Sequence, residues 1–423
     1  MRPRGEPSGA PKNSKLLELE GLRGIAALFV VFSHLQALFF PEDFGRYLQK
    51  LDASGSPGAF LLKCLSLAPF NGRFCVWIFW TLSGFALSYH FFQLRHAGAN
   101  AKSRSYLPEA ALRRYPRLLL PVLAATFFAF ALVRLGWMHS AELAVAVGPP
   151  GQPNAWIAGN YHFTPTLTGA VSAAFWTTFF SFHNSPLFDP PLWTMKREII
   201  GSFFLFGFLA VFGGRSWRWP VYLCAGVLFI GLRQIWLDSF LAGIILCDFR
   251  VNHLAGFMRE AEHRMGRFIR LRESAVLAVL VVLALVAAVG YFSQKRVVEI
   301  DSDPVSDSAY IVICFLVMAW IEFSVFLKNL LSRPFFSFLG KISFGLYISH
   351  YPFLFSAAAG FYLLVQSHMS HLAAAFLTAG LSLPAVIGLG TVFYLIADKP
   401  SVPFSKWLAS KIMALRPFPR RMD

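Results

Sequence analysis

Charged residues are scarce in this chain: Asp, Glu, Lys and Arg make up 14% of its 423 residues, whereas a soluble globular domain carries about a quarter. Hydrophobic residues reach 56%, and the mean hydropathy is +0.55. Apolar runs of about 20 residues, long enough to cross a bilayer, recur along the chain. The composition therefore excludes a soluble globular fold and predicts an all-α, polytopic transmembrane helix bundle.

The chain also has few cysteines and no cysteine motif. Its five cysteines include no CxxC pair and no Cys/His metal spacing, so no metal site is predicted. Cys64 and Cys75 fall in or beside a segment expected on the non-cytoplasmic side, where a disulfide is chemically feasible. Two free thiols at these positions explain the sequence equally well, and both alternatives stay open.

The amino-terminal segment lacks the marks of a cleavable signal peptide. Residues 1–18 are rich in Pro, Gly and Lys, with no short apolar region and no small-residue cleavage site. We therefore expect the first membrane span to remain in the mature protein.

Ten apolar runs are candidate membrane spans. They cover residues 22–40, 74–92, 117–135, 192–213, 219–232, 234–248, 274–292, 309–327, 342–365 and 371–397. The fifth and sixth runs are short for a hydrocarbon core of about 30 Å. Since ten is an even number, both termini are expected on the same side of the membrane.

The positive charges are distributed unevenly between the two sets of connecting segments. The segments on the side of the termini hold 27 Lys and Arg residues, and the opposite segments hold 7. By the positive-inside rule, both termini face the cytoplasm. The net charge of +16 is thus explained by topology and by contact with anionic lipid, and no nucleic-acid partner is expected. We predict a multi-pass integral protein of the plasma membrane or of an endomembrane.

The chain is expected to form one membrane domain. We predict a disordered cytoplasmic tail at 1–15, a ten-span membrane domain at 16–403 and a basic cytoplasmic tail at 404–423. The largest non-cytoplasmic segment, 136–191, contains no Lys or Arg. Within it, the short apolar stretch 171–183 is typical of an interfacial or re-entrant helix, which would either shape an acceptor site or serve as a cover.

Three ionisable residues lie inside predicted spans at comparable depths. A rise of about 1.5 Å per residue places His34 about 12 Å, Glu198 about 9 Å and His350 about 18 Å below the outer edge of the hydrocarbon core. Ionisable groups are costly in lipid and commonly mark functional sites. The three side chains could share one polar cavity; the alternative is that each merely bonds a backbone carbonyl or a neighbour.

A buried imidazole beside a carboxylate is suited to proton transfer. A neutral histidine can take a proton from a hydroxyl near pH 7 and return it later, and a carboxylate can fix its tautomer. We therefore predict that His34 acts as a general base and that Glu198 orients or charges it. His350 is a second candidate for positioning.

Arginines gather at the cytoplasmic ends of two spans. Arg23 precedes the apolar part of the span that bears His34, and Arg113, Arg114 and Arg117 directly precede the third span. Guanidinium groups bind phosphates through paired, charge-assisted hydrogen bonds. A phosphorylated ligand entering from the cytoplasm would meet them first. Anchoring by the positive-inside rule is the alternative, and it accounts best for Arg113.

Five motifs follow one another along the chain. They are LEGLRGIAALFVVFSH (19–34), IFWTLSGFALS (78–88), RRYPRLLLP (113–121), LWTMKREIIGSFF (192–204) and LGKISFGLYISHYP (339–352). Together they resemble the membrane acyltransferase-3 family, whose bacterial members O-acylate lipopolysaccharide, exopolysaccharide and antibiotic sugars. The resemblance covers about residues 16–403, and five motifs in this order are specific although each alone is weak.

The motifs depart from the family pattern at a few positions. Thr194 and Met195 replace the usual Ser and Leu, and Asp398 stands where the family commonly has Glu. Lys196 and Arg197 precede Glu198, and they could pair with Glu198 itself or with Asp189.

The resemblance implies transfer of an acyl group, acetyl or another short chain, from cytoplasmic acyl-CoA to a hydroxyl of a small-molecule, lipid or sugar acceptor. Acyl-CoA would then be a co-substrate, with no permanently bound cofactor. His34 is the implied essential residue, and Trp193 and His350 are expected on the acceptor side. The implied donor contacts are Arg23, Arg114 and Arg117.

Other interpretations remain open at this point. A proton-coupled transporter or flippase would also use buried His and Glu side chains, but the chain has no repeated halves and no matching pair of broken helices. A scaffold or receptor leaves the buried charges unexplained. Direct transfer and a covalent acyl-His34 intermediate are both compatible with the sequence. Segment 136–191 favours a hydrophobic or neutral acceptor, and the sequence does not identify any protein partner.

Overall fold

The structure, a computed structural model, describes residues 16–181, 188–258, 260, 274–293 and 304–415. These residues form helices joined by short connections, with no strand among them. The predicted all-α fold is therefore confirmed.

The helices of the amino-terminal half follow the predicted apolar runs and add short helices between them. In chain order they are α1 (Leu17–Phe39), α2 (Pro41–Ser54), α3 (Pro57–Leu67), the 3-10 turn η1 (Ala68–Phe70), α4 (Gly72–His96), α5 (Asn100–Arg134), α6 (Ser140–Val147), α7 (Ala155–Ala158), α8 (Leu167–Ser172), the π-helical turn η2 (Ala173–Thr177) and α9 (Thr178–Phe180).

The second half begins after residues 182–187. Its elements are the 3-10 turn η3 (Pro190–Trp193), α10 (Thr194–Val211), α11 (Arg218–Gly231), α12 (Trp236–Asn252), α14 (Ala275–Ser293), α15 (Pro304–Phe323), α16 (Val325–Leu331), α17 (Pro334–Phe353), the π-helical turn η4 (Leu354–Ala358), α18 (Ala359–Val365), α19 (His371–Phe393), the π-helical turn η5 (Tyr394–Asp398) and α20 (Lys399–Leu415).

Six of the described helices are long and apolar enough to cross a membrane. They are Leu17–Phe39, Gly72–His96, Asn100–Arg134, Val305–Phe323, Pro334–Val365 and His371–Leu415. All ten predicted runs lie on helices, but α11 and α12 have only 14 and 17 residues, and the first two turns of α10 contain three charged residues in a row, Lys196, Arg197 and Glu198. The count of ten spans and the cytoplasmic termini remain predictions.

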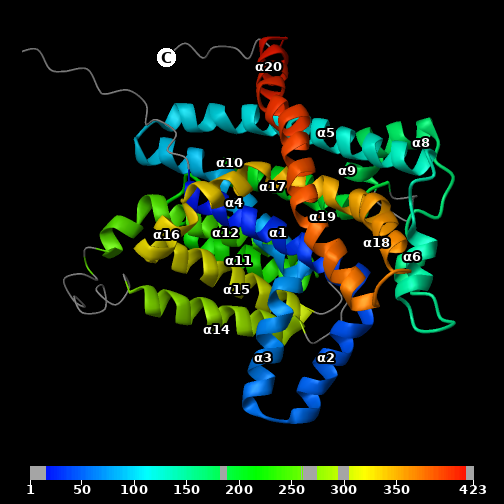
Figure 1. The fold of residues 1–423 in the computed structure, drawn as a ribbon. Helices are drawn as coiled ribbons and strands as arrows, with labels where there is room; N and C mark the ends of the chain where they lie inside the picture. The colour runs from blue at the N-terminus through cyan, green and yellow to red at the C-terminus, as the bar shows by residue number, and fades with distance from the viewer. Residues whose placement is uncertain (1–15, 182–187, 259, 261–273, 294–303, 416–423) are drawn as a thin grey trace, which may run out of the picture.

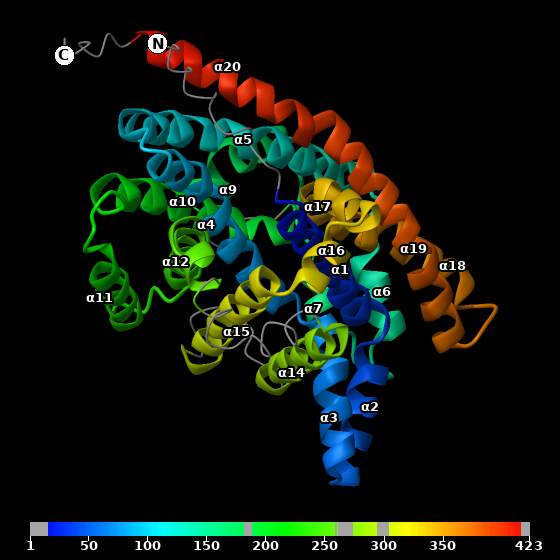
Figure 2. The ribbon, with the colours of Figure 1, turned by 90° about the vertical axis from the view of Figure 1, so that its left-hand side faces the viewer.

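The central helices are α1, α4, α12 and α17, and α11, α14, α19 and α20 lie around them (Figures 1 and 2). The helical pair α2–α3 projects from one end of the bundle, and the far end of α20 lies at the opposite end (Figure 2). His34 lies five residues before the end of α1, close to the end from which α2–α3 projects. The bundle thus has two distinct ends, with His34 near the one predicted to be non-cytoplasmic.

Glycines allow α1 and α17 to approach closely. A Cβ on Gly24 would lie 2.6 Å from the backbone nitrogen of Gly340, and a Cβ on Gly340 would lie 2.3 Å from the carbonyl oxygen of Glu20. Small residues at such crossings let helix backbones touch. Each glycine precedes a histidine of its own helix by ten residues, Gly24 before His34 and Gly340 before His350. The parallel helices therefore carry the two histidines at the same height.

The segment around 171–183 packs along α5 with one side exposed. Residues 167–180 form one helical stretch, whose Ala170 packs with Ala129 of α5 and whose Phe179 ring lies 5.1 Å from that of Tyr115. The stretch thus runs along about 20 Å of α5, in the opposite direction. Both expected forms, interfacial and re-entrant, remain predictions, and residues 182–183 lie outside the described part.

The carboxyl-terminal helices form one continuous rod, His371–Leu415. At about 1.5 Å per residue this rod is longer than a hydrocarbon core is thick, so part of it lies outside the membrane. Residues 404–415 of the predicted basic tail are helical and belong to α20. The predicted tail 1–15 and residues 416–423 lie outside the described residues.

The thiol of Cys75 is free and fully buried. The disulfide between Cys64 and Cys75 therefore does not form in this structure, which favours the alternative of two thiols.

Candidate functional site

His34 and His350 contact each other directly. Nε2 of His350 lies 3.1 Å from Nδ1 of His34, and the two ring centroids are 5.0 Å apart. His350 is fully buried, whereas His34 is half-buried. The edge of Tyr351 packs on the His34 ring, with the centroids 5.0 Å apart. Two residues that were predicted to share a cavity are thus brought together.

The hydrogen bonds of this pair define a proton arrangement. Nδ1 of His350 lies 3.1 Å from the carbonyl oxygen of Leu346, which can only accept, so this nitrogen carries the proton. Nε2 of His350 then offers a lone pair to Nδ1–H of His34, which also faces the carbonyl oxygen of Val30 at 3.0 Å. With its proton on Nδ1, His34 keeps an unprotonated Nε2. That lone pair is what a general base requires.

Glu198 lies in a separate ion pair and not in contact with the histidines. Its carboxylate is bound by the Arg114 guanidinium and accepts a hydrogen bond of 2.6 Å from Ser83. Arg114 also donates to the Ser202 hydroxyl at 2.8 Å. Both charged side chains are almost fully buried, so each charge depends on the other for compensation. The contact that orients His34 therefore comes from His350 rather than from Glu198.

Arg117 is held by the last π-helical turn. Its guanidinium donates to the Asp398 carboxylate at 2.5 Å and to the Ser401 hydroxyl. Asp398 closes η5, and π-helical turns often occur at functional sites. In the sequence, Asp398 stands out only as a departure from the family pattern. Its partner could not be read from the sequence, because the two residues are 281 positions apart.

Arg23 differs from the other two arginines. Its one recorded hydrogen bond is to the carbonyl oxygen of Gly340, at 3.2 Å, and its side chain is exposed. The charges of Asp398, Glu20, Arg117 and Glu198 act on its guanidinium. Arg23 therefore belongs to the same charged region as Arg114 and Arg117, and most of its hydrogen-bond donors are unused.

Trp193 packs in an aromatic cluster around a cation. The Arg197 guanidinium lies 5.5 Å from the Trp193 ring centroid, 5.8 Å from that of Trp80 and 5.9 Å from that of Trp236. Such stacking stabilises a guanidinium away from water. The oxygens of Asp189 have no hydrogen-bond partner, and the Glu198 carboxylate is bound by Arg114. The pairing of Lys196 or Arg197 with these carboxylates remains a prediction.

Trp193 is linked to the histidines through its neighbours in η3. The Tyr347 hydroxyl donates to the carbonyl oxygen of Pro191 at 2.9 Å and lies 3.0 Å from the Thr194 hydroxyl. The Tyr347 ring lies 6.1 Å from that of His350. Sequence reasoning missed Tyr347 and Tyr351, although both belong to the LYISHYP motif and flank His350.

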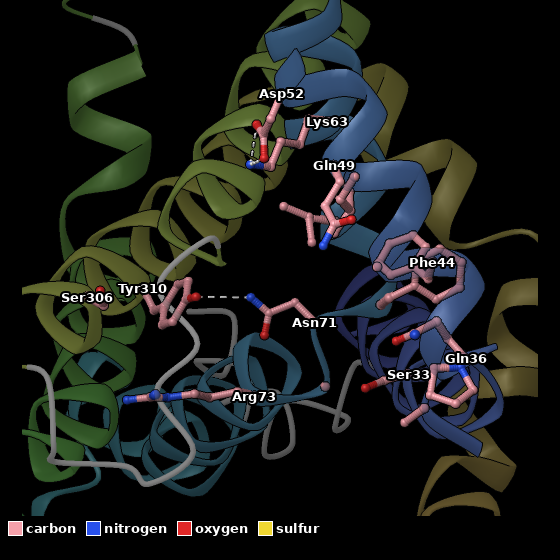
Figure 3. A pocket seen from close by; sticks show the side chains of 17 residues that line it. Ser33, Gln36, Phe44, Gln49, Asp52, Lys63, Asn71, Arg73, Ser306 and Tyr310 are labelled. Carbon is pink, nitrogen blue, oxygen red and sulfur yellow. Dashed lines mark hydrogen bonds and ion pairs between the residues drawn. The ribbon is translucent and has the colours of Figure 1, made fainter. Parts of the chain in front are cut away.

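A polar cavity of about 630 Å³ lies on an adjoining face of α1, beneath the α2–α3 pair (Figure 3). Ser33 and Gln36 of α1, Asn71 at the start of α4, and Tyr310 of α15 line it, and Asn71 donates to the Tyr310 hydroxyl at 3.1 Å. The lining does not include His34. The cavity and the histidine pair are therefore separate features at the same end of α1.

Comparison with known proteins agrees with the motifs. The profile of the acyltransferase-3 family, described as an acyltransferase domain, matches residues 16–395. The O-acetyltransferase PaAT-1 of Phomopsis amygdali is 27% identical over 443 residues, which cover 96% of this chain and 86% of that protein. No solved structure matches. Because the family profile spans nearly all of the helices described above, the chain belongs to this acyltransferase family.

Proposed function

We propose that this protein is an integral-membrane O-acyltransferase that moves an acetyl or other short acyl group from acyl-CoA to a hydroxyl of a neutral acceptor. The observation that carries the proposal is the contact between His34 and His350, because it leaves Nε2 of His34 free to accept a proton. Family membership supports acyl transfer, and the O-acetyltransferase relative supports a hydroxyl acceptor and an acetyl donor.

In the proposed reaction, Nε2 of His34 takes the proton of the acceptor hydroxyl. The hydroxyl oxygen attacks the carbonyl carbon of the thioester and forms a tetrahedral intermediate. The intermediate collapses, the bond from carbon to sulfur breaks, and the CoA thiolate receives the proton from His34. His350 acts as a positioning residue, since its lone pair holds His34 in the Nδ1–H tautomer.

The donor is proposed to bind at the arginines. Arg23 is the main contact for the CoA phosphates, because Arg114 and Arg117 already hold Glu198 and Asp398. Those two ion pairs join α5 to α10 and α5 to the last π-helical turn, and so hold the helices beside Arg23 in place. Arg23 precedes His34 by eleven positions, or about 16 Å of helix, a distance that a pantetheine arm can bridge.

Acetyl transfer by purified protein in lipid nanodiscs tests the proposal. With acetyl-CoA and a panel of neutral alcohols, we expect ester formation and stoichiometric release of the CoA thiol. His34→Ala should lower kcat by at least about 100-fold, because it removes the general base. His371→Ala is the matched control, since His371 lies outside the site and pairs with Asp43.

Near-normal turnover by a folded His34→Ala protein would refute the assignment of the base. Accumulation of an acyl-histidine adduct in the parent protein would replace direct transfer by the covalent route. Movement of the alcohol across the membrane with no release of CoA thiol would instead identify a transporter.

A further inference from the structure

Asp189 is a buried carboxyl group with no hydrogen-bond partner. The residue is 2% exposed, and neither side-chain oxygen forms a hydrogen bond. Burial raises the pKa of the Asp189 carboxyl well above its ordinary value. The residue directly precedes Pro190 and Pro191 of η3, so this backbone position is rigid. Unsatisfied buried polar groups are destabilising, and a group of this kind requires an explanation.

The neighbours of Asp189 in the chain contact the region of the tyrosines. The ring of Phe188 lies 5.1 Å from that of Phe163, two residues after Tyr161, and the carbonyl oxygen of Pro191 accepts a hydrogen bond of 2.9 Å from Tyr347. The ring of Tyr351 packs on His34, and the ring of Tyr347 lies 6.1 Å from that of His350. Asp189 therefore lies between two residues that contact the aromatic surroundings of the histidine pair.

Tyr161 contributes a second unpartnered group. Its residue is 8% exposed, its hydroxyl has no hydrogen-bond partner, and its ring centroid lies 6.3 Å from that of Tyr351. Its backbone φ is +59°, in the left-handed region that bulky residues rarely adopt. Strain of this kind is retained where a side chain must be held in a particular place.

The neighbouring tyrosines have partners, which makes the two exceptions informative. Tyr351 donates to the side-chain oxygen of Asn160 at 2.8 Å, and Tyr347 donates to the carbonyl oxygen of Pro191 at 2.9 Å. Only Asp189 and Tyr161 among these four residues lack such bonds. A structural role would have supplied them with partners, as it did for Tyr347 and Tyr351. A ligand that brings its own polar groups would satisfy both.

We propose that Asp189 and Tyr161 form a subsite for a second hydroxyl of the acceptor, so that the preferred acceptor is a neutral diol or polyol. A carboxyl group can donate to a hydroxyl and accept from it, and a phenol can do the same. One hydroxyl of the acceptor lies at Nε2 of His34 and reacts, while its neighbour bonds Asp189 and Tyr161. This assignment rests on the proposed acyl transfer and defines its substrate class.

Matched pairs of acceptors test the subsite. Purified protein in nanodiscs is given trideuterioacetyl-CoA with cyclohexanol or with the vicinal cyclohexanediol, and the labelled esters are measured by mass spectrometry. The parent protein should prefer the diol by about tenfold or more in kcat/KM, because a site that bonds a hydroxyl discriminates against its absence. Asp189→Ala should reduce that preference to less than about threefold.

Two further variants separate the subsite from a structural role. Asp189→Asn should keep part of the preference for the diol, since an amide also donates and accepts, and Tyr161→Phe should weaken the preference while keeping its ring. Asp189→Leu should raise the thermal midpoint without acceptor, because it removes an unsatisfied buried group. Glu142→Ala, an exposed acid of α6, is the control for both measurements.

The outcomes are distinguishable. An equal preference for the diol in the parent and in Asp189→Ala would refute the subsite and leave the acyl transfer intact. Preference for an amino alcohol over the diol would also refute it, since the site would then recognise a cation. Release of CoA with neither alcohol acetylated contradicts the diol assignment. Absence of both CoA release and ester formation counts against the proposed function itself.

Discussion

At the scale of single residues, His350 is the strongest candidate for a positioning residue, because it contributes to the reaction only by holding His34. Removing its lone pair in His350→Phe frees His34 to rotate or to change tautomer. We expect kcat to fall by about tenfold or more, with a small change in KM for acetyl-CoA. His350→Gln should recover part of the loss, because an amide oxygen can accept from Nδ1–H of His34.

Steady-state kinetics with acetyl-CoA as the varied substrate measures this split. The outcome against the assignment is equal activity in His350→Phe and His350→Gln, which would mean that the side chain only fills space.

Arg23 is predicted to contribute to donor binding more than its neighbours. Arg23→Ala should raise KM for acetyl-CoA by about tenfold with a smaller effect on kcat, since it removes charge-assisted bonds to phosphate. The effect should shrink at high ionic strength because the side chain is exposed. Arg95→Ala is the matched control, as Arg95 bonds the carbonyl oxygen of Gly214. An unchanged KM in Arg23→Ala would assign the donor site elsewhere.

The sequence predicted the residues of the site better than their pairing. The helical rise per residue predicts similar membrane depths for His34, His350 and Glu198, and in the structure the two histidines contact each other. Depth does not reveal which face of each helix turns toward which neighbour. Glu198 was therefore expected beside His34, whereas the structure places it beside Arg114. Only the arrangement of the helices in three dimensions decides between the two partners.

At the scale of helices, the Arg114–Glu198 pair joins α5 to α10. Arg114→Leu alone would leave a buried carboxylate without compensation, at a cost of about 3–5 kcal/mol in the free energy of unfolding. The double variant Arg114→Leu/Glu198→Leu should regain most of that loss, because no charge then remains buried. Thermal unfolding in detergent measures the difference. If the double variant is no more stable than Arg114→Leu alone, the two charges do not compensate each other.

The glycine contact between α1 and α17 is expected to set the spacing of the histidines. Gly340→Ala would place a Cβ 2.3 Å from the carbonyl oxygen of Glu20, so the helices must separate. Activity should fall by about tenfold or more although both histidines are intact, because a displacement of about 1 Å is costly in catalysis. Gly207→Ala is the matched control, since nothing lies within 4 Å of its Cβ position.

For Gly340→Ala and for its control Gly207→Ala, kcat is compared with that of the parent protein. Expression and the thermal midpoint are measured in parallel. Equal activity in Gly340→Ala and Gly207→Ala would show that the close approach is not needed for the reaction. The GLRG motif is visible in the sequence, but its role in helix packing is not, because the partner of Gly24 is Gly340, more than 300 positions away.

At the scale of the whole molecule, the helical class followed from the apolar runs, and the structure confirms it. The runs do not determine how completely each helix crosses the membrane. The short helices α11 and α12 satisfy backbone hydrogen bonds internally, as lipid requires, whatever their depth. The cavity of Figure 3 could not be predicted either, because its lining combines residues of α1, α2, α3 and the start of α4 with residues of α15, more than 200 positions further along the chain.

The orientation of the bundle is the last prediction. The connecting segments assigned to the cytoplasmic side hold 27 Lys and Arg residues, and those on the opposite side hold 7. Residues 136–191, on the opposite side, carry none. In a Cys224→Ser background, which removes the exposed cysteine, an impermeant maleimide should label Lys102→Cys on the side of a cytoplasmic marker. Gln152→Cys should be labelled in such sealed vesicles only after permeabilisation, because α5 would separate the two positions. Both residues are exposed, so accessibility to water does not differ between them.

Labelling of both from one side would mean that α5 does not cross the membrane. The donor arginines and the outer segment would then share a compartment, and acyl-CoA and acceptor would have to enter the site from the same side.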